Sequence, residues 1–198
     1  MPNRMLPLLA AGLLVFAAPV RLPATTVVPP SFAELVNGSD YIVHAVVRDV
    51  RAEKRDRNGA PRIVTLVELE VREVVAGEPP ATVVLELLGG SVGRETMTVT
   101  GQPQFAVGDE DILFVKSNGR SLSPLYAMMF GRYPVRTDAT TGRRWVAREN
   151  GSPLAAITAV ATAMDSVPSG PAPAPGMAPA DFIRAIRATY DRPVPNPQ

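Results

Sequence analysis

Two long stretches of the chain alternate apolar and polar side chains with a period of two. Residues 41–50 are rich in β-branched side chains and become polar at alternate positions, and residues 62–75 carry Glu68 and Glu70 on one face. A period of two is the signature of a strand whose two faces differ. The polar residues 56–59 between these stretches favour a turn, so the sequence predicts a hairpin of two long strands.

Shorter strand-like segments follow, separated by glycine and proline. They cover residues 82–88, 95–100, 112–115, 125–130, 133–136 and 144–147, and a glycine-rich connection at 89–93 joins the first two. Short strands at this spacing, with turn signals between them, are typical of antiparallel barrels and sandwiches. The predicted fold class is therefore mainly β: an antiparallel OB-like barrel, with a β-sandwich as the alternative.

Helices are predicted at both ends of this β region. Ser31 and Glu34 form a capping-box pattern that begins a short helix at 32–37. A C-terminal helix is expected at 180–190, with an apolar stripe made of Phe182, Ile183, Ile186 and Tyr190. We expect the stripe to dock on the chain's own barrel; docking on a partner protein is the alternative.

The first thirty residues predict export. Arg4 precedes an apolar run at 5–20 and a Pro-rich stretch at 21–30, which is the layout of a signal peptide. The run is shorter than the roughly 20 apolar residues that span a bilayer, so we expect cleavage after Ala17 or Ala24 and no stable transmembrane span afterwards. The mature protein is then periplasmic or secreted.

These patterns divide the chain into four parts. We expect a signal peptide at 1–24, a β-barrel domain at 25–150, an Ala/Pro-rich connector at 151–179 and a C-terminal helix and tail at 180–198. Residues 167–179 hold five prolines and two glycines, which is too little apolar surface to fold alone. Within the connector, residues 153–164 are also compatible with a helix.

Composition narrows the chemistry. The chain has no cysteine and a single histidine, His44, which excludes thiol chemistry, thiolate metal sites and disulfides. Its 20 basic and 19 acidic residues are nearly balanced and scattered, so the electrostatic attraction behind nucleic-acid binding is weak. We expect no metal, no cofactor and no nucleic-acid partner.

Ser91 is the one candidate nucleophile with a motif around it. The sequence Gly-Gly-Ser-Val-Gly at 89–93 matches the Gly-x-Ser-x-Gly pattern and follows a predicted strand. A nucleophile elbow needs a helix behind the serine and a histidine later in the chain, but residues 95–100 are strand-like and His44 lies upstream. We therefore interpret the motif as a glycine-rich strand connection.

Three other features have a structural and a functional interpretation. His44 is expected to be a half-buried strand residue, with a contact or pH-sensing role as the alternative. Glu68 and Glu70 could form a carboxylate pair, although an exposed, charge-compensated strand face explains them more simply. The acidic residues 109–111 could ligate calcium, although a solvated turn before a buried strand accounts for them.

Several segments also support a family resemblance. They are residues 32–36, 40–43, 46–47, 71–77, 89–90, 105–109 and 113–114. Together they resemble a group of uncharacterised exported bacterial proteins, and their layout is similar to the netrin-like domain of metalloprotease inhibitors. The resemblance covers residues 31–136 and implies an OB-like barrel. Those inhibitors present an N-terminal cysteine to the protease zinc, and this chain has none, so their inhibitory chemistry is not implied.

The sequence thus favours an exported, non-enzymatic domain that binds an unknown ligand or a protein partner in the cell envelope. No residue is assigned a catalytic role. The candidate contact residues are Gly89, Gly90, Ser91, Arg94, His44, Phe182 and Ile186, and the loop at 117–125 is a second place to look. The alternatives are a hydrolase or protease regulator that uses Ser91, Glu68 or Glu70, and a structural envelope component.

Overall fold

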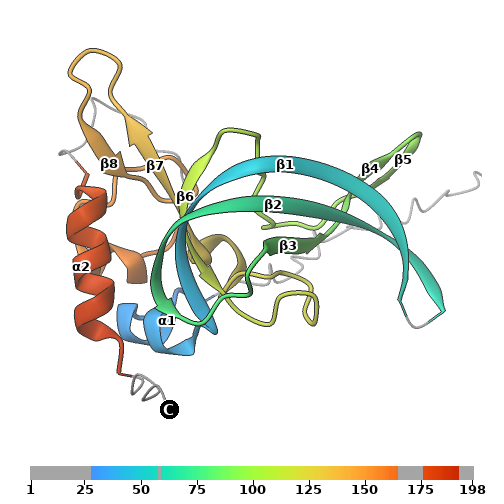
Figure 1. Cartoon of the computed structure of the whole chain (residues 1–198), viewed down its shortest axis with the longest axis horizontal. Coiled ribbons are helices and arrows are strands. Elements are labelled where there is room, and N and C mark those ends of the chain that lie inside the picture. The colour runs from blue at the N-terminus through green and yellow to red at the C-terminus, as the bar shows by residue number, and fades with distance from the viewer. Residues whose placement is uncertain (1–27, 58, 165–175, 192–198) are drawn as a thin grey trace, which may run out of the picture.

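The computed structural model describes residues 28–57, 59–164 and 176–191. The predicted signal peptide and most of the proline-rich stretch lie outside these residues. The described chain forms a curved antiparallel sheet, with helices gathered at one end and a small hairpin at the other (Figure 1). Among the described residues, no helix has both the length and the apolar character needed to cross a membrane.

The predicted hairpin of two long strands is confirmed. It consists of β1 (Tyr41–Arg57) and β2 (Ala60–Gly77), and both strands extend beyond the predicted ranges. Asp56 accepts a hydrogen bond from the backbone N–H of Gly59 at 2.8 Å, which closes the turn. The β1–β2 register shifts at three places. Such bulges bend a strand pair, and Figure 1 shows the two strands arching together.

The main sheet contains six strands in the order β3-β2-β1-β6-β7-β8. The other four are β3 (Val83–Leu88), β6 (Glu110–Val115), β7 (Arg132–Thr137) and β8 (Arg144–Val146), and every pairing is antiparallel. The mainly β class with antiparallel strands is therefore confirmed. The sheet is open, with β3 and β8 at its edges, so closure into an OB barrel is not observed in the described residues and stays a prediction.

Two local predictions were wrong, and a third is confirmed in part. The connection expected at 89–93 contains a strand, β4 (Gly90–Val92), which pairs with β5 (Glu95–Met97). The strand expected at 95–100 is therefore present, but it ends at Met97. The strand expected at 125–130 is replaced by a 3₁₀ turn, η1 (Met128–Gly131). Ala127 and Met128 have φ of 49° and 56°, and this left-handed conformation interrupts a strand.

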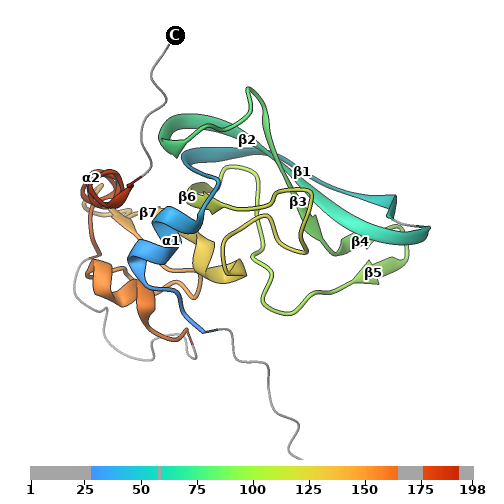
Figure 2. The ribbon, with the colours of Figure 1, turned by 90° about the horizontal axis from the view of Figure 1, so that it is seen from below.

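Both predicted helices are present. The first, α1 (Phe32–Gly38), begins with the capping box: Glu34 N–H donates to Ser31 Oγ at 3.2 Å, and Ser31 N–H donates to Glu34 Oε2 at 2.8 Å. The second, α2 (Pro179–Thr189), lies across the end of the sheet near α1 (Figure 2). The short helix expected within 153–164 is a 3₁₀ turn, η2 (Ile157–Ala161).

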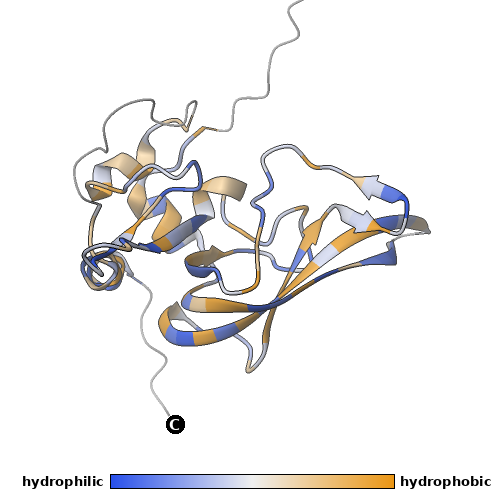
Figure 3. Ribbon diagram, turned by 90° about the horizontal axis from the view of Figure 1, so that it is seen from above, coloured by the Kyte–Doolittle hydropathy of each residue, from blue (hydrophilic) through white to orange (hydrophobic). Residues whose placement is uncertain are grey.

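The sheet buries apolar side chains on both faces. One cluster joins the helices to the sheet, and Phe182 of α2 lies 6.1 Å from Phe114 and 5.0 Å from Tyr133 between ring centroids. The other cluster lies on the opposite face of β1, β2 and β3, where Val43 is buried while its neighbour Ile42 belongs to the first cluster. Figure 3 shows the resulting bands of apolar and polar residues along the long strands.

Part of the expected connector belongs to the core. Leu154 and Val160 are fully buried in the cluster around α2. Met177 N–H donates to the carbonyl of Leu154 at 2.7 Å, and Val146 N–H donates to the carbonyl of Met177 at 2.9 Å. These two hydrogen bonds place the start of the α2 segment beside β8. The domain boundary predicted at residue 150 therefore does not separate two packing units in the described chain.

Candidate functional site

A cavity of about 390 Å³ lies between the sheet and the segment 89–105. Figure 2 shows β4, β5 and the chain that follows them running opposite β1, β2 and β3. The apolar part of the lining includes Val50, Leu87, Met97, Val99 and Phe105, and the polar part includes the side chains of Thr65, Ser91, Thr96, Thr98 and Gln102. None of the described side chains in this lining is ionisable.

The glycines at 89 and 90 let β4 approach the sheet closely. Gly89 has φ of 105° and Gly90 has φ of 133°, where residues with a side chain are strained. A Cβ atom on Gly90 would lie 2.5 Å from Thr65 Oγ1 and 3.1 Å from Ala52 Cβ. The carbonyl of Gly89 accepts a hydrogen bond from Thr65 Oγ1 at 2.7 Å. Both glycines therefore shape one end of the cavity.

Ser91 lies in the cavity lining, and its only side-chain hydrogen bond among the described residues is to a hydroxyl. Its Oγ lies 2.9 Å from Thr96 Oγ1, and this hydroxyl pair is exposed. The histidine of the chain is engaged elsewhere: Nε2 of His44 lies 2.6 Å from Oε1 of Glu110, to which Arg144 also donates. A serine nucleophile needs an adjacent base, and Ser91 has a threonine instead.

The remaining predicted contact residues lie apart from the cavity. Arg94 is exposed in the β4–β5 turn and does not line it. Phe182 and Ile186 are fully buried in the chain's own core, so the docking of α2 on its own sheet is confirmed. His44 is a half-buried residue of β1, as expected.

The carboxylates of β2 form a charge-compensated face. Glu70 pairs with Arg48 and Arg72, and Glu68 lies 3.8 Å from Arg51. All of these side chains are at least one-third exposed. This agrees with the exposed, charge-compensated strand face predicted for Glu68 and Glu70.

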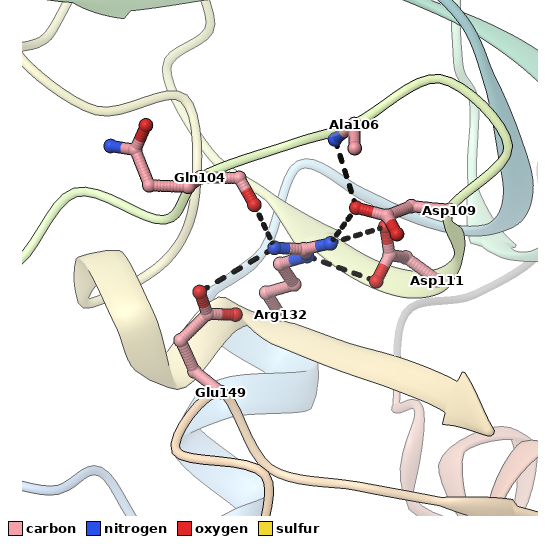
Figure 4. Close-up of polar contacts among 6 residues, drawn as sticks. All are labelled: Gln104, Ala106, Asp109, Asp111, Arg132 and Glu149. Carbon is pink, nitrogen blue, oxygen red and sulfur yellow. Dashed lines mark hydrogen bonds and ion pairs between the residues drawn. The ribbon is translucent and has the colours of Figure 1, made fainter.

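A buried arginine anchors one wall of the cavity (Figure 4). Arg132 of β7 is 4% exposed and pairs with Asp111 at 2.9 Å, Asp109 at 2.7 Å and Glu149 at 3.4 Å. It also donates to the carbonyl of Gln104, and its guanidinium carbon lies 4.3 Å from the centroid of the Phe105 ring. Gln104 and Phe105 line the cavity, so Arg132 fixes that wall from behind.

The charges in this cluster perturb one another. Burial raises the pKa of Asp111 above its ordinary value, although Arg132 opposes the rise. Burial likewise raises the pKa of Glu149 to about 7, again against the attraction of Arg132. Oε2 of Glu149 is buried without a hydrogen-bond partner among the described residues, which disfavours the ionised carboxylate. The cluster therefore holds a carboxyl group that titrates near neutral pH.

Sequence reasoning missed this cluster. The acidic residues 109–111 were expected to form a solvated turn, but Asp111 is fully buried. Glu110 points to His44, while Asp109 and Asp111 meet Arg132. The available signal was Arg132 itself, a charged residue within the apolar stretch Phe-Gly-Arg-Tyr-Pro-Val at 130–135. No group of three acidic or histidine side chains in the described chain is arranged to hold a metal ion.

The loop at 117–125, the second predicted contact region, covers an edge of the sheet. Asn118 Oδ1 accepts a hydrogen bond from Glu86 N–H at 2.9 Å, and its Nδ2 donates to the carbonyl of Val84 at 2.7 Å. Leu88 N–H donates to the carbonyl of Leu122 at 3.2 Å. These contacts occupy backbone groups on the outer edge of β3, which would otherwise be free to pair with another chain.

The cavity with the uncharged lining and the arginine cluster behind it are thus the candidate site. Comparison of the chain with protein-family models, with curated proteins and with solved structures finds no match.

Proposed function

We propose that this chain is an exported, non-enzymatic binding domain and that its ligand occupies the cavity between β1–β3 and residues 89–105. The observation that carries the proposal is the absence of any ionisable side chain from the described lining, in a chain of which 20% of residues are charged. A pocket with an apolar surface and a few polar groups is the usual form of a ligand site.

The same lining selects the ligand class. A charged ligand would lose its hydration in this cavity without meeting an opposite charge, which is costly. An uncharged ligand with apolar groups and a few hydrogen-bonding groups meets matching partners in Val50, Leu87 and the hydroxyls of Thr65 and Thr98. The cavity therefore suits a neutral ligand.

The lining also supports a role without catalysis. General acid–base chemistry needs a titratable group within hydrogen-bond reach of the reacting atoms, and the described cavity side chains provide none. The hydrolase alternative rested on Ser91, Glu68 and Glu70. The two glutamates are paired with arginines on an exposed strand face, and the only side-chain hydrogen bond of Ser91 among the described residues is to the Thr96 hydroxyl. In the structural-component alternative, the C-terminal helix would tether the domain to a larger assembly, but α2 is docked on the domain's own sheet.

Site-directed photocrosslinking tests the binding site. A benzophenone amino acid replaces Ser91 in the purified protein, and a matched control carries it at Thr140, which is exposed in the β7–β8 turn. Both proteins are irradiated in envelope extract and culture fluid of the source organism. We expect adducts of uncharged molecules at position 91 only. Equal adducts at both positions, or labelling of Ser91 by a fluorophosphonate, would contradict the proposal.

Export is tested separately by cell fractionation. We expect the full chain outside the cytoplasm, shortened by cleavage after Ala17 or Ala24, and a version lacking residues 1–24 inside the cytoplasm. An uncleaved full chain in the cytoplasm would refute export and leave the cavity proposal in place.

A further inference from the structure

We infer that the ligand is an extended, uncharged peptide segment that pairs with the free backbone edge at Phe105. This inference rests on the proposed function, because it names the ligand class for the same cavity. It adds a recognition mode in which the ligand's main chain contributes hydrogen bonds, as in strand addition.

The segment that forms the cavity wall has few backbone partners. Across the described residues 98–105, the only backbone-to-backbone hydrogen bond joins Gln102 N–H to the carbonyl of Val99, at 3.3 Å. The strand pairing of β5 with β4 ends at Met97. The N–H and C=O groups of native proteins nearly always find partners when they are buried, so a ligand that covers this wall has to supply them.

The direction of the backbone N–H and C=O of Phe105 follows from the hydrogen-bonded backbone groups of its two neighbours. The carbonyl of Gln104 accepts from Arg132, and Ala106 N–H donates to Asp109 Oδ2 at 2.9 Å, on the same side of the chain (Figure 4). The chain runs straight from Gln104 to Ala106 in Figure 4. In such an extended run, residues two apart direct their N–H and C=O groups to one edge, and the residue between them uses the other edge. The backbone groups of Phe105 therefore point away from the arginine cluster.

Phe105 is the residue at which a strand can pair. It lines the cavity, and in the described structure neither its N–H nor its C=O makes a hydrogen bond. An incoming extended peptide can exchange two hydrogen bonds with one such residue, as paired residues do in an antiparallel ladder. Arg132 holds the wall in place before the ligand arrives, which reduces the entropy lost on binding.

The lining favours a peptide over a neutral sugar. Phe105 is the only aromatic side chain in the described lining, and the Arg132 guanidinium lies against its ring at 4.3 Å. The cavity therefore has no tryptophan or tyrosine platform for a sugar ring. Its volume of about 390 Å³ is within the range of small ligand sites, about 300–1,000 Å³, and suits a few residues.

A peptide library tests the inference. The purified protein selects from immobilised hexapeptides with blocked termini, built from Ala, Val, Leu, Ser and Thr, beside a library with Glu or Lys at alternate positions. The tightest peptide is then resynthesised with one N-methyl amide at a time. We expect selection of uncharged peptides only, and a loss of affinity of about tenfold at the one amide that donates to the Phe105 carbonyl, because N-methylation removes a donor.

Two variants at one position locate the pairing. Phe105→Pro removes the N–H, whereas Phe105→Ala keeps it, and both remove the ring from Arg132. A residue before proline prefers an extended conformation, so Gln104 tolerates the change. Because both variants lack the ring, their difference reports the N–H alone: we expect Phe105→Pro to bind the selected peptide about tenfold more weakly than Phe105→Ala, with equal melting temperatures as the folding control.

The outcomes separate this inference from the proposed function. Selected peptides that tolerate every N-methyl group, or that bind both Phe105 variants equally, would refute strand pairing and keep a neutral-ligand cavity. No selection at all would refute the peptide assignment. In that case, NMR shifts of residues 89–105 with maltotriose and with octyl glucoside decide the proposed function. Shifts confined to the cavity with either compound support it, and the absence of shifts with both contradicts it.

Discussion

Arg132 and Asp111 form a two-point ion pair inside the protein. Nε of Arg132 lies 2.9 Å from Oδ1 of Asp111, and Nη2 lies 3.2 Å from Oδ2. The arginine side chain is 4% exposed and the aspartate side chain 1%. This parallel geometry fits the planar guanidinium of an arginine, whereas a lysine ammonium or a histidine ring cannot form it. The pair links β6 to β7 and, through Gln104, to the wall of the cavity.

Arg132→Met is expected to destabilise the fold strongly. Removing one member of a buried ion pair leaves uncompensated charge, which costs about 3–5 kcal/mol of unfolding free energy. The measurement is urea unfolding at pH 7.5, with Arg136→Met as the control. Arg136 is exposed on the same strand, so its loss should change stability by less than about 0.5 kcal/mol. Equal effects of the two variants would contradict an anchoring role.

The pKa of Glu149 predicts an unusual pH dependence of stability. It is about 7 in the folded protein against 4.5 for an ordinary glutamate. Between these values the folded state binds more protons than the unfolded chain, so the free energy of unfolding falls as the pH rises from about 4.5 to 7. The whole effect is about 3 kcal/mol. Burial of Asp111 acts in the same direction.

Glu149→Gln isolates this effect. The amide cannot ionise, so the variant should gain about 3 kcal/mol over the wild type at pH 7.5 and almost nothing at pH 4.5. Unfolding free energies measured between pH 4.5 and 8 give the difference curve, in which groups common to both proteins cancel. A variant that is less stable than the wild type at pH 7.5 would show that the carboxylate stabilises the cluster instead.

The parts of the fold that sequence reasoning located depend on local patterns. The β1–β2 hairpin follows from a period of two on either side of a polar turn, and α1 follows from the spacing of Ser31 and Glu34. The stripe of α2 indicated its docking because Phe182 and Ile186 recur at a helical spacing. Each of these signals lies within one element or two consecutive ones.

The parts that were missed depend on contacts between distant residues. Arg132 meets Gln104, Asp109 and Glu149 only when β6, β7 and two loops come together. In the sequence, residues 109–111 therefore look like a solvated turn. A buried polar cluster of distant residues leaves no periodic pattern of apolar and polar positions that would reveal it. The cavity was located in part: Gly89, Gly90 and Ser91 were candidate contact residues and line it, but no pattern in the sequence indicated that residues 102–104 line it too.

Phe182→Ala tests whether α2 is part of the core. The ring is fully buried against Phe114 and Tyr133, and its truncation leaves a cavity that costs about 3–5 kcal/mol. Arg184→Ala, on the exposed side of α2, should cost less than about 0.5 kcal/mol. Chemical unfolding measures both variants. If Phe182→Ala unfolds like the wild type, the helix does not dock in solution and its stripe is available to a partner.

Asn118→Ala tests whether the loop at 117–125 protects the sheet edge. The variant frees the backbone N–H of Glu86 and the carbonyl of Val84, and an exposed strand edge pairs readily with other chains. We expect a loss of about 1–2 kcal/mol, together with self-association that grows with protein concentration in analytical ultracentrifugation.

Arg120→Ala serves as the control for this change, because the Arg120 side chain is highly exposed in the same loop and lies 3.5 Å from Asp40 in an exposed ion pair. It should stay as stable and as dispersed as the wild type. Self-association of both variants would assign the effect to loop mobility and not to the uncovered edge of β3. An Asn118→Ala protein that stays dispersed would show that Leu122 alone, through its bond to Leu88, is enough to block pairing at this edge.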